Sequence, residues 1–225
     1  MKKTNRYKST LIGLGFAAFT LHTASAVAGE RPFYFELDFE QQRIPQESNS
    51  RLEANAFGFL YREFLSDHMA LSLRLGRLTV EHEQNALAFG FDPSGYYVGL
   101  GFNSHTAEKN RLQAGFDLSY SYYDSREERD TETLDVSWTQ GEAKLWASVR
   151  ISTQFKLYGC VFALSLDGDQ KLKGTTTSKQ SLENMDDSGE CAGLILETED
   201  YGVVGIEGSG GARQGGLIYF GKRFY

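Results

Sequence analysis

Three carboxylates, Glu36, Asp38 and Glu40, recur at every second position near the start of the chain, and a single histidine, His82, lies between two glutamates. Carboxylates that share a confined space serve as an acid–base pair, as a cation filter or as partners of buried arginines. A histidine oriented by a carboxylate is a common general base. These two groups are the first candidates for chemistry in this sequence.

Other signs of an enzyme are missing. No Gly-x-Ser-x-Gly motif accompanies His82, and the His-x-Ser-Asn pattern of lipid A deacylases is absent. Asp186-Asp187 resembles the aspartate pair of omptin proteases, but its companion pair would have to be Asp67-His68, at the opposite end of the expected topology. We therefore predict that the protein is not an enzyme and that His82 is a solvated surface residue. Catalysis at His82 is the weak alternative.

The two cysteines, Cys160 and Cys191, face each other if the chain forms a hairpin centred at 175–176, with Gly174–Thr177 at its tip. We predict a disulfide, which would stabilise the fold by about 3–4 kcal/mol in the chain-entropy model. A register one residue different would leave two thiols on opposite faces. Neither zinc nor redox spacing is present, and Asp167-Gly168-Asp169 lacks the rest of a calcium loop, so no metal or cofactor is predicted.

The chain begins like an exported protein. Four basic residues precede the apolar stretch Leu11–Leu21, and small residues follow up to Ala28. This pattern predicts a signal peptide over residues 1–28, read by the Sec pathway, and a mature domain over 29–225. Residues 1–28 hold four of the 23 basic residues and none of the 30 acidic ones, so the mature chain carries a formal charge of −11. Such a charge argues against nucleic acid as a partner.

Alternation of apolar and polar residues predicts an all-β protein. From 111 to 123, Leu112, Phe116 and Tyr120 share one face, while Asp117 lies on the other. Period two over this length is typical of a strand. The clear strands run about 9–14 residues, which suits a tilted membrane strand better than the usual 5–6. Leu71–Leu75 and Leu78–Val80 differ in phase, and we predict a bulge near Gly76-Arg77.

Turn positions predict a closed antiparallel barrel of ten strands, with eight as the alternative and both termini in the periplasm. Short turns are expected at 66–68, 105–110, 152–154 and 199–200, and longer polar links at 44–50, 84–94, 125–133, 167–189 and 209–213. The expected strands are 31–43, 51–64, 69–83, 95–104, 111–124, 134–151, 155–166, 190–198, 201–208 and 214–225. Interface aromatics are expected near strand ends, at Tyr61, Phe64, Tyr120, Tyr122, Tyr123, Trp138, Phe220 and Phe224.

The end of the chain resembles the C-terminal insertion signal of bacterial outer-membrane barrels. Its residues are Phe220, Gly221, Phe224 and Tyr225, and the terminal aromatic of the signal is either Phe224 or Tyr225. The resemblance is to the small OmpA/OmpX-type barrels as an architectural class. It implies the Gram-negative outer membrane as the location, and the barrel-assembly machinery as a partner during insertion.

Closure of the barrel explains the carboxylates. The first strand would pair with the last one, which offers Arg223 and, near its other end, Arg213. A narrow lumen cannot solvate many like charges, so we predict a lattice of ion pairs that fills it. The expected members are Glu36, Asp38, Glu40, Arg62, Arg74, Asp117 and Arg223.

Three functions remain open at this stage. The first is a structural or surface-interaction barrel that displays acidic loops, above all 167–189, to lipopolysaccharide, other membrane lipid or an external ligand. The second is a narrow pore for small solutes or ions. The third is a rim enzyme that acts on lipid through His82. A soluble barrel, with the same faces turned inside out, is the alternative to all three.

Overall fold

The computed structural model describes residues 32–45, 51–83, 88, 90–174, 177–198 and 202–225, without the side chains of His82 and Glu83. The expected signal peptide over 1–28 lies outside these residues. No helix in the described part of the chain has the length and apolar character needed to cross a membrane.

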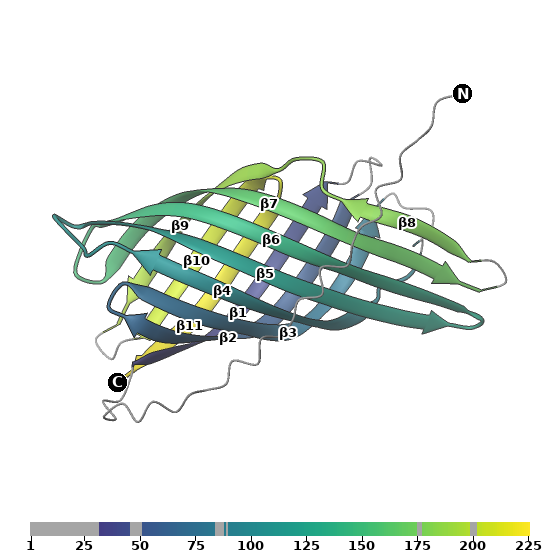
Figure 1. Ribbon diagram of the computed structural model, residues 1–225, viewed down its shortest axis with the longest axis horizontal. Coiled ribbons are helices and arrows are strands. Elements are labelled where there is room, and N and C mark those ends of the chain that lie inside the picture. Colours follow the sequence, from purple (N-terminus) through teal and green to yellow (C-terminus); the bar gives the residue numbers. More distant parts are fainter. Residues whose placement is uncertain (1–31, 46–50, 84–87, 89, 175–176, 199–201) are drawn as a thin grey trace, which may run out of the picture. The chain divides into compact units, whose positions relative to one another are not determined.

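Eleven antiparallel strands make up the fold (Figure 1). They are β1 Phe33–Pro45, β2 Arg51–Ser66, β3 Met69–Glu83, β4 Ser94–His105, β5 Leu112–Arg129, β6 Glu132–Arg150, β7 Phe155–Lys173, β8 Ser178–Glu183, β9 Ser188–Glu197, β10 Gly202–Gly211 and β11 Gln214–Phe224. Ten of them form a ring, because β1 pairs with β11 and β6 pairs with β7. The eleventh, β8, pairs with the far end of β7.

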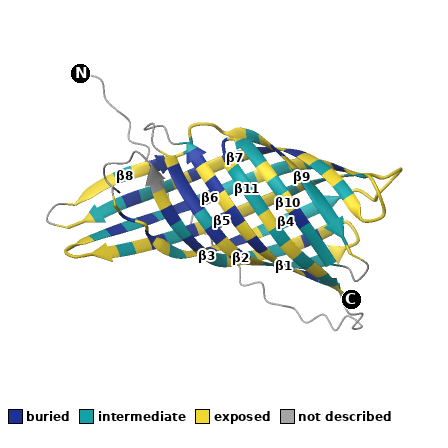
Figure 2. Cartoon of the chain, turned by 180° about the vertical axis from the view of Figure 1, so that it is seen from behind, coloured by how far each residue is buried: buried dark blue, intermediate teal, exposed yellow. Residues whose placement is uncertain are grey.

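The ring contains ten strands, which confirms the prediction of ten and not the alternative of eight. The expected strands 190–198 and 201–208 correspond to β9 and β10, which pair with each other and close the wall between β7 and β11. Exposed and buried residues alternate along the strands, as period two requires (Figure 2). In β1, the exposed Phe35, Leu37 and Phe39 point outward, and the buried Tyr34, Asp38 and Glu40 point into the barrel.

The predicted bulge at Gly76-Arg77 is wrong. Pairing between β2 and β3 is continuous there, and the register shifts between Phe64 and Ser66 instead. What changes in β3 is the chemistry of its two faces: Leu71–Leu75 carry their apolar side chains outward, whereas Leu78 and Val80 carry theirs inward. The strand therefore leaves a section of barrel with an apolar outer wall and enters one with an apolar interior.

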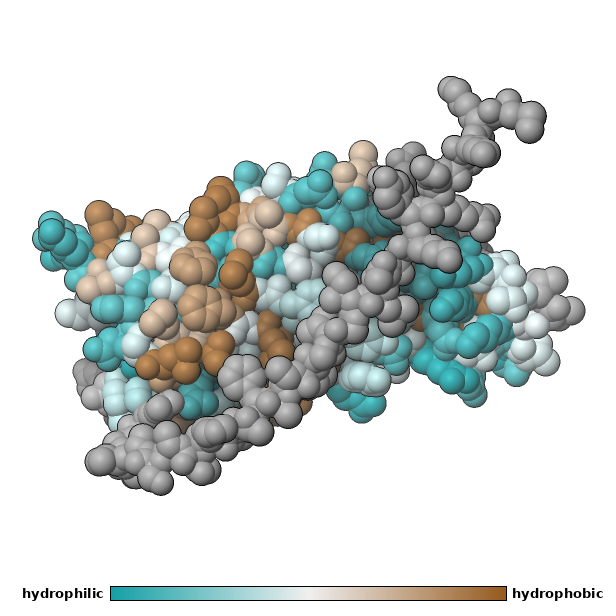
Figure 3. Space-filling model, viewed as in Figure 1, coloured by the Kyte–Doolittle hydropathy of each residue, from teal (hydrophilic) through white to brown (hydrophobic). Residues whose placement is uncertain are grey.

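Four strands extend beyond the others. β5 and β6 pair out to Arg129 and Glu132, and β7 and β8 form a further hairpin (Figure 1). The expected links 125–133 and 167–189 are therefore mostly strand, which corrects the prediction of loops. The reason is that Leu134, Leu172 and Leu182 alternate inward and pack in an apolar core. The outer surface of this extension is hydrophilic, while apolar atoms gather on the rest of the barrel wall (Figure 3).

Inward-facing aromatic rings lie against glycines of neighbouring strands. A Cβ on either Gly58 or Gly76 would clash with the ring of Tyr97, and one on Gly115 would clash with the ring of Trp146. Glycine leaves room for a large side chain to cross the interior of a narrow barrel, and the ring in turn covers the bare backbone. Further pairs of this kind are Tyr34 with Gly221, Tyr158 with Gly193, Tyr219 with Gly205, and Phe162 with Gly189.

Candidate functional site

The carboxylates of β1 point into the lumen and meet an arginine of β3. Nε of Arg74 donates to Oδ2 of Asp38 at 3.0 Å, and Nη2 of Arg74 donates to Oε2 of Glu40 at 2.9 Å. The hydroxyl of Tyr97 donates to Oδ1 of Asp38 at 3.2 Å. Asp38 is only 1% exposed, so these partners replace its hydration.

Arg213 is the centre of a second group of charges. Its Nη1 lies 2.8 Å from Oε2 of Glu142 and 3.4 Å from Oε1 of Glu40, and its Nη2 lies 3.8 Å from Oε1 of Glu207. Lys144 lies 3.3 Å from Oε2 of Glu207. Glu40 therefore joins the two groups into one ion-pair network across the lumen.

The link between β10 and β11 gives Arg213 its position. Gly211 has a φ of +85°, a conformation that L side chains rarely adopt, and the link that follows it folds inward. Ala212 is fully buried, and its N–H donates to the carbonyl of Ser188 at 2.9 Å. Arg213 then reaches the three carboxylates from a link rather than from a strand.

The remaining residues of the expected lattice also face the lumen but make other contacts. Glu36 accepts a hydrogen bond from the hydroxyl of Tyr34 at 2.7 Å, and the guanidinium of Arg62 lies over the Tyr34 ring at 5.3 Å. Asp117 accepts from Nδ2 of Asn103 at 2.8 Å. The guanidinium of Arg223 stacks on the ring of Phe64 at 4.1 Å. The structure thus brings together Asp38, Glu40 and Arg74, and places the other four nearer the end of the barrel that carries the short turns.

Sequence reasoning missed Glu142, Lys144 and Glu207, which complete the network. For Glu142 and Lys144, the sequence signal is the alternation over Gly141–Leu145. Both charges occupy inward positions of β6, and the outward residues between them are small or apolar. It also missed Tyr158, whose hydroxyl donates to Oε2 of Glu207 at 2.6 Å.

An apolar core fills the interior at the end where β5 to β8 extend. Trp138 is 1% exposed, and its ring stacks on Tyr123 at 4.5 Å, with 4° between the planes. Tyr123 in turn stacks on Tyr97 at 5.4 Å. The prediction that Tyr123 and Trp138 belong to an interface girdle is therefore wrong. The other core residues are Ile44, Leu52, Ala54, Ala56, Leu78, Val80, Ala88, Phe91, Leu134, Val136, Leu166 and Leu182.

A polar cavity of about 430 Å³ lies on the other side of the ion-pair network. Its lining runs from Arg74 and Arg213 to His105, Gln113 and Glu197, which lie toward the short turns. Beyond it, Arg150 pairs with Glu108 at 2.9 Å and with Glu197 at 2.7 Å. Hydrogen bonding to Arg150 lowers the pKa of Glu108 in the turn that follows β4.

Cys160 and Cys191 form the predicted disulfide. Cys160 on β7 and Cys191 on β9 are direct cross-strand partners, with their Cα atoms 4.9 Å apart. Both are buried in the interior. Phe162, Leu164 and Ala212 pack with them. The residues of the predicted hairpin tip that fall at 175–176 lie outside the described residues, but β7 and β8 pair on both sides of them.

We expect the Cys160→Ser/Cys191→Ser double variant to lose about 3–4 kcal/mol of unfolding free energy, because the bridge closes a 31-residue loop. Urea unfolding of the refolded protein in detergent measures this change. Wild-type protein treated with a reductant is the matched control and should reproduce the loss. A double variant as stable as the oxidised wild type would contradict the expectation.

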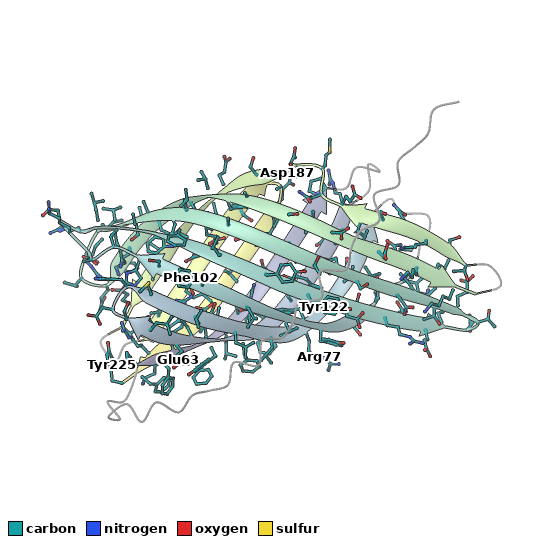
Figure 4. The ribbon with its side chains drawn as sticks, in the orientation of Figure 1. Glu63, Arg77, Phe102, Tyr122, Asp187 and Tyr225 are labelled. Atoms are coloured by element: carbon teal, nitrogen blue, oxygen red, sulfur yellow. A yellow bond between two sulfur atoms is a disulfide. The ribbon has the colours of Figure 1, made fainter. Side chains whose placement is uncertain are left out.

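The rim residues considered for catalysis lie at opposite ends of the barrel. The rings of His68 and His105 form an edge-to-face pair at 5.6 Å, at the end that carries the short turns. Asp187 follows β8 at the other end, where it accepts from Nδ2 of Asn184 at 3.1 Å and points outward in Figure 4. The side chain of His82 lies outside the described residues. The structure does not bring Asp67-His68 and Asp186-Asp187 together.

Metal ligands are not assembled in the described part of the chain, where no group of three or more His, Cys, Asp or Glu side chains has a suitable arrangement. Asp169, from the Asp-Gly-Asp segment, pairs with Lys179 at 2.8 Å.

The end of β11 shows which residues of the expected insertion signal share a face. Phe220 and Phe224 point outward, with Phe224 stacked on Phe33 at 5.0 Å, while Gly221 faces inward against Tyr34. The outward apolar register therefore ends at Phe224, with the exposed Tyr225 beyond it. Recognition of this end by the assembly machinery stays a prediction.

Solved structures similar to this chain are outer-membrane barrels. The translocator domain of the autotransporter NalP from Neisseria meningitidis has a TM-score of 0.50 at 12% identity, over 86% of this chain and 88% of that chain. The outer membrane protease OmpT from Escherichia coli has 0.47 at 7% identity, over 88% and 96%. Ail, the attachment invasion locus protein of Yersinia pestis, has 0.40 at 13% identity, over 87% and 99%.

No protein-family model and no curated protein sequence matches this chain. At 12% identity, the similarity to the NalP domain shows the fold alone. The fold is that of a Gram-negative outer-membrane β-barrel, with ten strands in its ring.

Proposed function

We propose that this protein resides in the outer membrane as a closed barrel with a structural or surface-interaction role, and that its lumen does not conduct. The observation that carries the proposal is the double closure of the interior. The Arg213 network crosses the lumen at one level, and the core around Trp138 fills it at another. An ion would have to pass both a set of buried, paired charges and a packed apolar section.

The arrangement of the turns supports an orientation. The turns at 67–68, 106–111 and 151–154 are short and share one end with the chain terminus, while the β5–β8 extension lies at the other end. In bacterial barrels the short turns are periplasmic and the longer segments are extracellular. We propose the same here, with both termini in the periplasm and β5–β8 outside the cell.

The proposed extracellular extension is polar and acidic on its outer side. Acidic residues outnumber basic ones over 124–135 and over 167–190. Some are engaged internally, as Asp135 is by Lys173 and Asp169 is by Lys179. The remaining negative charge suits lipopolysaccharide bridged by divalent cations, or a basic external ligand.

The test has two arms. In planar bilayers, the purified barrel should give no stepwise conductance, and stable conductance steps would favour the narrow pore instead. In intact cells, a membrane-impermeant maleimide should label Lys179→Cys but not Asp67→Cys, because the two positions lie at opposite ends of the barrel. Labelling of Asp67→Cys alone would reverse the orientation. Faster migration of unboiled protein on SDS gels should accompany both arms, as for a closed barrel.

A further inference from the structure

The outer wall of β10, β11 and β1 to β4 carries two adjacent cross-strand rows of different chemistry. The first, here called the apolar row, is Ile206, Ile218, Phe39, Phe57, Arg77 and Tyr96. The second, here called the small polar row, is Gly208, Gly216, Gln41, Asn55, Thr79 and Ser94. The small polar row lies one step closer to the β5–β8 end, and the apolar outer wall stops between the two rows.

A groove of about 1010 Å³ follows this boundary. Phe39, Phe57, Ile206 and Ile218 line its apolar side, and Gln41, Asn55, Thr79 and Ser94 line its polar side. Gly216 also lines it, beside Gly208, where an added Cβ would meet no atom within 4 Å. The absence of two side chains hollows the wall at this place.

Arg77 is the only charged residue of the apolar row. Its side chain projects from the outer wall (Figure 4), between Phe57 and Tyr96 as cross-strand partners. No hydrogen bond or ion pair engages this guanidinium among the side chains that the structure describes. The small polar row beside it offers hydroxyls and amides but no carboxylate. In the next row, Glu53 is held by Arg43 at 2.7 Å, and its partner Glu81 lies two rows from Arg77 along β3.

We propose that this groove binds lipopolysaccharide, with a lipid A phosphate on Arg77 and an acyl chain along Phe39, Phe57 and Gly216. A guanidinium fits a phosphate through two parallel hydrogen bonds, and the apolar surroundings strengthen the pairing because they exclude water. Asn55, Thr79 and Ser94 supply further donors at headgroup level. The inference rests on the proposed orientation, which puts this boundary of the apolar wall in the outer leaflet.

The competing interpretation is an interfacial arginine that extends into water without a lipid partner. Two features favour the lipid. The groove combines an apolar side and a polar side at the level of Arg77, as an amphiphile requires. The second feature is that Gly216 and Gly208 leave space at the floor of the groove. An arginine that only extends into water would require no such groove.

The experiment uses barrel extracted from the outer membrane in mild detergent and analysed by native mass spectrometry for bound lipid A. Wild-type protein should carry it. Arg77→Gln removes the charge, and Gly216→Leu fills the floor, where an added Cβ would lie at a contact distance of 3.4 Å from the Glu207 carbonyl oxygen. Arg77→Gln should retain about a tenth of the wild-type occupancy, in line with the loss of one charge-assisted contact. Gly216→Leu should also lower the occupancy, because its side chain takes the place of the acyl chain.

Lys222→Gln is the matched control, because Lys222 is an outward basic residue at the opposite edge of the apolar wall. It should keep full occupancy. Purified barrel titrated with lipid A, dephosphorylated lipid A and phosphatidylglycerol supplies the second readout. Wild type should prefer phosphorylated lipid A by about tenfold, and Arg77→Gln should lose this preference.

Three outcomes would overturn the inference. They are equal occupancy in wild type and Arg77→Gln, an equal loss in Lys222→Gln, and equal binding of phosphatidylglycerol, which would assign the groove to phospholipid. None of these outcomes affects the closed lumen, which conductance tests separately. Reversed maleimide labelling would instead remove the orientation on which both proposals depend.

Discussion

Replacing Arg213 with alanine is expected to lower the unfolding free energy of the barrel by about 3–5 kcal/mol, one of the largest effects of any single substitution in this chain. The guanidinium is 9% exposed and lies within 4 Å of Glu40, Glu142 and Glu207. Its removal leaves three carboxylates in a confined lumen, where Arg74 and Lys144 are their remaining basic partners among the described side chains. The loss of stability arises because buried carboxylates are left without their partner. It is larger than the net stabilisation that the ion pairs give the intact protein.

Two comparisons separate this cause from a loss of packing, since Arg213 also covers the ring of Phe162 at 5.1 Å. Arg213→Met keeps an apolar side chain there, and combining it with Glu142→Gln should recover part of the stability. Arg126→Ala is the control for charge alone, because Arg126 is 59% exposed beside Glu128 and Asp135. Exposed pairs contribute about 0–1 kcal/mol, so this variant should be nearly neutral.

The unfolding free energy of all four variants is measured by urea unfolding in detergent, with the gel mobility of unboiled protein as the readout. Equal stability of Arg213→Ala and Arg126→Ala would mean that the lumen solvates its carboxylates freely. The network would then be no barrier to ions, and the non-conducting function would lose one of its two supports.

The strands of this fold could be predicted from the sequence because period two is a local property. Strands as different as 33–45 and 112–129 show it plainly, and the ring of ten follows from their number and their turns. The facing pair of Cys160 and Cys191 was also predicted, although the hairpin is not regular: the register of β7 with β8 would place Cys160 opposite Glu190, and the step from β8 to β9 shifts the register by one residue.

The alternation does not show which face of a strand points into the barrel and which points outward. In a membrane section apolar residues face outward, but beyond it they face inward, and the alternation itself is unchanged. Tyr120 and Trp138 therefore appear alike in the sequence, although the first is outside the barrel and the second is in its core. The odd or even position of each residue along its strand would have separated them. Tyr123 lies on the opposite face of its strand from Tyr120 and Tyr122, and Trp138 lies on the same face as Leu134 and Val136.

The ion-pair network was predictable only in part. Asp38 and Glu40 lie on β1 and Arg74 on β3, with only β2 between them, and alternation fixes the inward direction of all three. Arg213 comes from the link after Gly211, and its reach depends on a backbone conformation that the sequence does not specify. Glu142 and Glu207 become its partners because closure of the ring leaves only β7 and β9 between β6 and β10, a relation that no local pattern contains.

Replacing Trp138 with alanine is expected to cost about 3–5 kcal/mol of unfolding free energy, which is the usual range for a large aromatic in a packed core. The Trp138 ring is stacked on Tyr123 at 4.5 Å, and Gly168 beside it has no side chain that could move into the space. Trp138→Phe retains part of the stack and should lose less. Trp146→Ala is the matched control, because Trp146 is only partly buried, and we expect a smaller loss.

The same variant tests how the lumen is closed. If the apolar core and the Arg213 network each block the barrel, Trp138→Ala alone should stay silent in planar bilayers, and Arg213→Ala alone should stay silent too. Only the double variant should show conductance steps, provided that gel mobility shows it to be folded. Conductance from Trp138→Ala alone would mean that paired charges do not stop ions, and the core would then be the single closure. A silent but folded double variant would place the barrier in other side chains of the narrow lumen, such as Tyr34 and Tyr97.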